Sequence, residues 1–140
     1  MADKERLAKY IQELYRYLRH LDELQKHSAQ EFLSDWRIHE LAERQLHLAL
    51  ETFLTVGEIV ISGFGFRKPD TYADIPRILF ENKVIGKKLM DQLVDLARFR
   101  NVLVHDYLYV DHERVHQHMQ KDSKIIKQFI EAIKKFVAMQ

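Results

Sequence analysis

The eight residues from Arg100 to Tyr107 hold the densest group of reactive side chains in the chain. They include a permanent cation, a titratable imidazole and a phenol, contributed by Arg100, His105 and Tyr107. Three aliphatic residues lie between the polar ones: Val102, Leu103 and Val104. This mixture indicates a partly buried segment whose polar side chains lie at one end of a packed helix or strand.

An arginine and a histidine beside a phosphodiester suit RNA cleavage without a metal ion. Imidazole can move the proton of the 2′-hydroxyl, while a guanidinium group stabilises the charge that develops on the phosphorane. The same residue types also fit a purely structural role. Arg100 could pair with an acid such as Asp95 or Glu43, and His105 could satisfy a buried carbonyl group. Spacing alone leaves both interpretations open.

Helix geometry sets a condition on any site that uses both residues. Arg100 and His105 are five positions apart, about 500° of rotation, so on a straight helix they point ~140° away from each other. Asn101, in contrast, shares a face with His105. Either the helix distorts or ends near His105, or the site combines residues from two copies of the chain. The second route predicts a dimer.

The composition favours one soluble helical domain over residues 1–140. Of the 140 residues, 46% are apolar and 31% are charged, and glycine and proline are scarce. The net charge of +1 gives no electrostatic case for DNA or any other nucleic acid, so such a function must come from a local site. Because the chain has no cysteine, no signal-like start and no apolar run near ~18 residues, we expect a cytoplasmic protein without a membrane span.

Apolar residues recur at spacings of three and four along most of the chain, which predicts an all-α fold. Short connections between long amphipathic segments favour an antiparallel bundle of four long helices plus one short helix. The main loop covers residues 62–72. The expected long helices run over about 3–25, from Ser34 or Asp35 to about 60, from about 87 into the Arg100 segment, and over 111–137, with the short helix over 74–86.

The second expected helix has a polar face formed by His39, Glu43, Arg44, His47 and Glu51. Such a face is usually solvated surface. The alternative is a polar groove that this helix shares with the Arg100 segment.

A second motif, His112-Glu113-Arg114-Val115-His116, matches the H-E-x-x-H pattern of zinc hydrolases. Its context argues against catalytic zinc. Arg114 places a charge in the middle of the motif, and the next glutamate, Glu131, is roughly 22 Å further along the same expected helix. His118 points elsewhere on the helix, so no third ligand is evident. Adventitious metal binding by His112 and His116 stays open.

The Arg100 segment also resembles a known family. Arg100, four residues, His105, one residue and Tyr107, with Asn101 after the arginine, resemble the signature of HEPN-domain proteins, in particular the HepT-like toxins of toxin–antitoxin pairs. Other features that support the resemblance are Glu43-Arg44-Gln45-Leu46 in the second helix, the loop Pro69-Asp70-Thr71-Tyr72, and the short helix before Arg100.

The resemblance implies a helical homodimer whose cleft at the dimer interface is a metal-independent ribonuclease site without a cofactor. Arg100 and His105 would be catalytic, and Asn101 would orient the substrate or the catalytic pair. The implied partners are RNA and an MNT-type minimal nucleotidyltransferase antitoxin, which in some systems adds AMP to the motif tyrosine, here Tyr107. Neither DNA nor a membrane is implied.

Two other functions remain consistent with the sequence. Members of this kind have also been interpreted as non-catalytic subunits that bind a nucleotide or present a substrate to a nucleotidyltransferase. The chain could also be a structural helical module that only mediates interactions.

Overall fold

The computed structural model describes residues 3–105, 108 and 110–140, and in these residues it contains six helices and no strand. The predicted all-α class and the four long helices are confirmed, and a second short helix, α2, is added. Tyr107 lies outside the described residues. The helices are α1 (Lys4–Leu24), α2 (Ala29–Ser34), α3 (Trp36–Gly63), α4 (Asp74–Glu81), α5 (Lys87–His105) and α6 (His112–Ala138).

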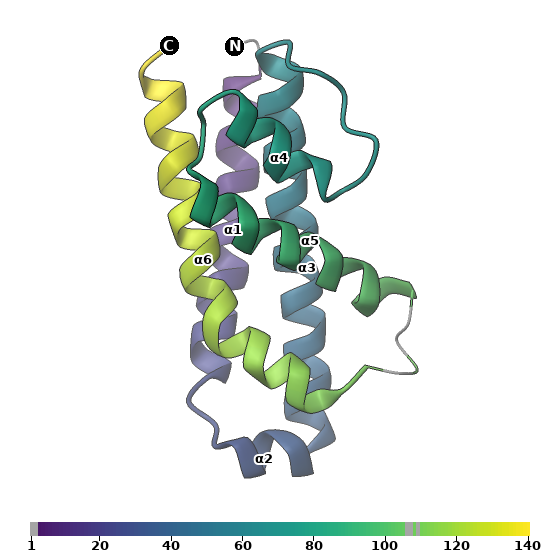
Figure 1. The fold of residues 1–140 in the computed structure, drawn as a ribbon. Helices are drawn as coiled ribbons and strands as arrows, with labels where there is room; N and C mark the ends of the chain where they lie inside the picture. Colours follow the sequence, from purple (N-terminus) through teal and green to yellow (C-terminus); the bar gives the residue numbers. More distant parts are fainter. Residues whose placement is uncertain (1–2, 106–107, 109) are drawn as a thin grey trace.

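The three longest helices, α1, α3 and α6, run along the length of the bundle, and α5 crosses them obliquely (Figure 1). α1 packs against α3 and α6, while α5 packs against α3, α4 and α6. The chain runs along α1 and returns along α3, so these two helices are antiparallel. α2 lies at one end of the bundle, and α4 lies near the end where both termini are found (Figure 1).

The core follows the apolar pattern of the sequence. On α1 the buried residues Leu7, Ile11, Leu14, Leu18 and Leu21 form the predicted stripe. α3 is buried over most of its length, since other helices cover several of its faces. By length and composition α3 could cross a membrane, but 61% of its most apolar window is buried in the bundle, as expected of a core helix.

α2 lies between the first two long helices, in a segment for which the sequence analysis predicted no helix. Ser28 and Glu31 form a capping box, in which the Ser28 hydroxyl accepts from the Glu31 amide and the Glu31 carboxylate accepts from the Ser28 amide. The fully buried Phe32 anchors this single turn and a half to the core. Asp35 then caps α3 as predicted, because its carboxylate accepts from the Arg37 amide.

Phe99 fixes the packing of α5 on α6 directly beside Arg100. The His118 ring stacks on the buried Phe99 ring with 3.6 Å between centroids, and His118 Nδ1 lies 2.9 Å from Asp122 Oδ2. Burial raises the pKa of the Asp122 carboxyl, while His118 acts in the opposite direction. His118 therefore serves the interior of the bundle and is not available as a third ligand beside His112 and His116.

Gly57 allows α4 to approach α3 closely. A Cβ atom placed on Gly57 would lie 2.4 Å from the Cγ2 methyl of Ile75, a fully packed residue of α4. The small residue thus sets the distance between the two helices.

We predict that Gly57→Ala lowers the free energy of unfolding by about 1–3 kcal/mol, although alanine is the better helix former, because the new methyl group overlaps Ile75. Chemical denaturation measures the change. The double variant with Ile75→Ala removes the clashing methyl, so the two losses should be less than additive. Strict additivity would show that the contact does not set the helix spacing.

Candidate active site at the crossing of α3 and α5

Arg100 is held between α5, α3 and the loop that precedes α4. Its side chain is only 11% exposed, and its Nε donates to Glu51 Oε1 at 2.6 Å. The guanidinium carbon lies 4.4 Å from the centroid of the Tyr72 ring, a distance typical of a cation–π contact. Three elements therefore determine the position of one cation.

Asn101 contacts Arg100 directly. Arg100 Nη1 donates to Asn101 Oδ1 at 3.1 Å. A guanidinium group has five N–H donors in a fixed fork, and these contacts engage only those on Nε and one on Nη1. Within the residues that the structure describes, Nη2 makes no hydrogen bond, and a guanidinium fork has the geometry that suits a phosphate.

The polar face of α3 forms a groove with the Arg100 segment, as the second of its two interpretations predicted. Glu51 Oε1, which accepts from Arg100, also lies 3.2 Å from His47 Nε2. A cavity of about 470 Å³ opens beside this pair. It is lined by His39, Glu40, Glu43, Arg44 and His47 from α3, by Leu103 from α5, and by Val110 and His112.

His105 is the last residue of α5 and is exposed. The side chain is therefore not buried against a carbonyl group. Of the predicted site residues, Arg100 and Asn101 are in contact, and His105 lies one turn and a half further along the same helix.

The ion pair of Arg100 differs from the pairs that the sequence suggested. Asp95 Oδ1 lies 4.0 Å from Arg98 Nη1, and Glu43 Oε1 lies 2.8 Å from His112 Nδ1. Glu51 is the partner instead. One pattern in the sequence could have pointed to Glu51 as the partner. Glu43, His47 and Glu51 are four residues apart and therefore share one face of a helix.

The two histidines of the H-E-x-x-H motif make packing contacts. The ring of His112 stacks on that of His39 with 3.9 Å between centroids. His116 packs against the Phe32 ring at 5.0 Å and lies 3.3 Å from the Gln120 amide nitrogen. Within the residues that the structure describes, no three histidine, aspartate or glutamate side chains converge as metal ligands.

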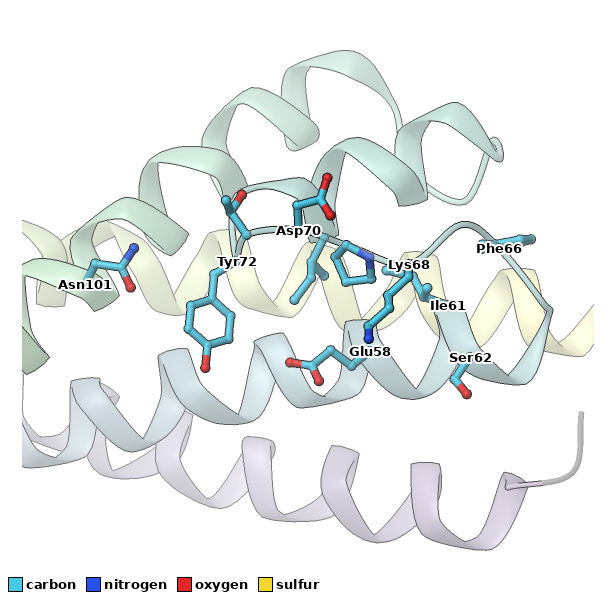
Figure 2. A pocket seen from close by; sticks show the side chains of 11 residues that line it. Glu58, Ile61, Ser62, Phe66, Lys68, Asp70, Tyr72 and Asn101 are labelled. Atoms are coloured by element: carbon cyan, nitrogen blue, oxygen red, sulfur yellow. The ribbon is translucent and has the colours of Figure 1, made fainter.

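A larger cavity of about 770 Å³ lies on the other side of Arg100, between α3 and the loop before α4 (Figure 2). Tyr72 and Asn101 line it, and both contact Arg100. Sequence reasoning did not predict this cavity, because the composition of residues 62–72 indicates only a turn between helices. Its lining comprises Glu58, Ile61 and Ser62 of α3, Phe66, Lys68, Pro69, Asp70, Thr71 and Tyr72 of the loop, Ile75 of α4 and Asn101 of α5.

These side chains provide the elements of phosphate chemistry. The guanidinium group of Arg100 contacts Tyr72 and Asn101, which line one cavity, and Glu51, which lies beside His47 in the lining of the other. The exposed imidazole of His105 lies on the same helix. The guanidinium group can bind an anion and stabilise added negative charge, and the imidazole can accept or donate a proton.

The sequence matches a family model described as ribonuclease HepT-like over residues 9–133. A curated relative, the putative RNase YutE of Bacillus subtilis (strain 168), is 33% identical over 107 residues, which cover 74% of each chain.

Solved structures agree on the fold. The structure of YutE, described as a cytosolic protein of unknown function from Bacillus subtilis, superposes with a TM-score of 0.86 at 25% identity and covers 98% of this chain and 92% of that one. A tri-AMPylated HEPN toxin of Shewanella oneidensis, in complex with its MNT antitoxin, superposes with a TM-score of 0.85 at 21% identity and covers 96% and 99%. At that identity the second likeness shows the fold alone.

We predict that Glu51→Ala lowers the free energy of unfolding by about 1–3 kcal/mol, because it leaves the largely buried Arg100 without its carboxylate. Glu51→Gln should cost less, since the amide oxygen can still accept from Nε. Both values follow from urea denaturation.

The surface pair between Arg67 and Glu81 is the matched control. This pair is bidentate, whereas a single hydrogen bond joins Arg100 to Glu51, but its side chains are 47% and 49% exposed, so Glu81→Ala should cost less than about 1 kcal/mol. Equal losses in Glu51→Ala and Glu81→Ala would contradict a special role for the Arg100 pair.

Proposed function

The chain belongs to the ribonuclease HepT-like family, and from that premise we propose that it is a metal-independent endoribonuclease and the toxin of a HEPN/MNT toxin–antitoxin pair. The observation that carries the proposal is the fixed guanidinium group of Arg100, whose Nη2 makes no hydrogen bond to the residues that the structure describes, on the same helix as the exposed His105. Residues 1–140 would act as one HEPN-like domain in the cytoplasm.

The proposed reaction is a transfer within the RNA strand. His105 takes the proton of a 2′-hydroxyl, whose oxygen then attacks the adjacent phosphorus. The bond from phosphorus to the 5′-oxygen breaks, that oxygen leaves with a proton, and a 2′,3′-cyclic phosphate remains. Arg100 stabilises the extra negative charge on the phosphoryl oxygens, and Asn101 helps to orient the guanidinium group.

The proposed site is shared by two protomers of a homodimer. On one α5, Arg100 points into the contact with α3, whereas His105 is exposed at the end of the helix. Five positions on a helix separate the two directions by ~140°. A homodimer in which the two α5 helices pack against each other solves this problem. In such a dimer, His105 of one protomer can approach Arg100 of its partner. The two-fold symmetry of such a dimer would create two equivalent pairs.

The proposed partner is an MNT-type nucleotidyltransferase that silences the toxin. The phenol oxygen of Tyr107 would attack the α-phosphate of ATP, pyrophosphate would leave, and an AMP group would remain on the tyrosine. This group would introduce a phosphate and a base two residues from His105, and it would thereby block the access of RNA.

We predict that the purified protein cleaves RNA in the presence of EDTA and that His105→Ala lowers the rate by about 10²–10⁴-fold, the usual contribution of a general acid or base. Arg100→Ala should lower it at least as much. Because Arg100→Ala also removes a packed side chain, Arg100→Lys keeps the charge and tests the fork geometry. Gel analysis of a structured RNA provides the rates.

Arg98→Ala and His27→Ala are the matched controls. Arg98 is exposed and lies near Asp95, whereas His27 is partly exposed and lies near Glu31. They should retain the full rate. If the folded wild-type protein binds nucleotides and a nucleotidyltransferase but cleaves no RNA, it is a non-catalytic partner subunit. Full activity of both His105→Ala and Arg100→Ala would contradict the ribonuclease mechanism.

We also predict that co-expression with an MNT-type nucleotidyltransferase adds AMP to Tyr107, which mass spectrometry of the intact protein and of its peptides will detect. Tyr107→Phe should lose this modification and remain toxic when the nucleotidyltransferase is present. Unchanged AMP addition to the Tyr107→Phe chain would assign the modification to another residue.

A further inference from the structure

The 770 Å³ cavity in Figure 2 has a polarity that does not suit phosphate. Its size is within the range of ligand pockets, about 300–1,000 Å³. Glu58 and Asp70 contribute two carboxylates and Lys68 contributes one amine, so the lining is acidic on balance. Five further lining residues are apolar or aromatic, and three are polar but uncharged. The first group is Ile61, Phe66, Pro69, Tyr72 and Ile75, and the second is Ser62, Thr71 and Asn101.

We propose that this cavity is a base-binding subsite that accepts a guanine of the RNA next to the phosphate held by Arg100. The proposal rests on the proposed function and deepens it, because it assigns a base preference to a site that otherwise contacts only the backbone of RNA.

Two contacts connect the cavity to Arg100. Tyr72 lines the cavity and lies under the guanidinium group at 4.4 Å. Asn101 lines the cavity and accepts from Arg100 Nη1 at 3.1 Å. A phosphate on the free N–H groups of Arg100 therefore places its neighbouring nucleotide at the mouth of the cavity. The flat apolar walls then suit a base, which can stack on an aromatic ring.

Glu58 selects among the four bases. Figure 2 shows its carboxylate directed toward Tyr72, whereas the carboxylate of Asp70 points away from α3. A carboxylate accepts hydrogen bonds and donates none, so its partner must present N–H groups. Guanine presents two parallel donors on one edge, N1–H and the N2 amine, which match the two oxygens of a carboxylate. Adenine and cytosine present one amine each, and uracil presents one imide N–H.

The remaining polar groups suit the same base. The O6 atom of guanine is an acceptor beside N1, and both the Lys68 amine and the Asn101 amide are donors in the lining. The Lys68 side chain extends from the loop toward the side of α3 that carries Glu58 (Figure 2). An acceptor next to two donors is the pattern that only guanine offers at this edge.

Binding of RNA that cannot be cleaved tests the subsite separately from catalysis. Four fluorescent 2′-O-methyl tetranucleotides that differ only in one base (guanine, adenine, cytosine or uracil among uridines) are titrated into the protein, and anisotropy gives each Kd. The guanine ligand should bind about tenfold more tightly than the others, the usual discrimination of a bidentate pair. Glu58→Gln should reduce this preference to about twofold or less, because the glutamine NH2 group is a donor and would face one of the two N–H donors of guanine.

Glu23→Gln, in an exposed residue at the far end of α1, is the matched control and should retain the full preference. If the protein prefers guanine and Glu58→Gln removes the preference, the subsite is supported. This holds even if the wild-type protein cleaves no RNA, since only the proposed ribonuclease activity then fails. Equal binding of all four ligands, or a preference that survives Glu58→Gln, overturns the subsite even if RNA is cleaved.

Discussion

The ion pair between Arg100 and Glu51 is the interaction on which the site depends. A guanidinium group that is only 11% exposed has lost most of its hydration, so it needs a carboxylate and further partners at fixed positions. Glu51 of α3 and the ring of Tyr72 meet this need. The oblique crossing of α5 over α3 is therefore tied to one side chain, and that side chain is the cation with which the protein would bind phosphate.

Two cavities lie near this crossing, and they differ in the side chains that line them. On one side, His39, Glu43, His47 and His112 line a groove in which imidazoles and carboxylates are in contact with each other. On the other side, Tyr72 and Glu58 belong to a cavity that combines aromatic and apolar side chains with a carboxylate acceptor. An RNA strand that crosses Arg100 would meet both. The fixed cation would bind the backbone, and the cavity beside it would distinguish the bases.

Local patterns in the sequence predicted the helices well, because each apolar stripe reports the face that a helix buries. α2 was missed as a helix, although its capping residues Ser28 and Glu31 were visible, because a single short turn has almost no periodicity. The partner of Arg100 was also missed. Glu51 lies 49 residues away, and the angle at which two helices cross depends on contacts such as that of Gly57 with Ile75, which no local pattern encodes.

The central claim is that Arg100 of one protomer works with His105 of the other, and mixing two inactive variants tests it most directly. Arg100→Ala and His105→Ala chains, unfolded together and refolded, form mixed dimers in which one of the two sites keeps both residues. Random mixing should restore about a quarter of the wild-type RNA cleavage rate, since half of the dimers are mixed and each has one intact site. A mixture as inactive as either variant alone would contradict the shared site.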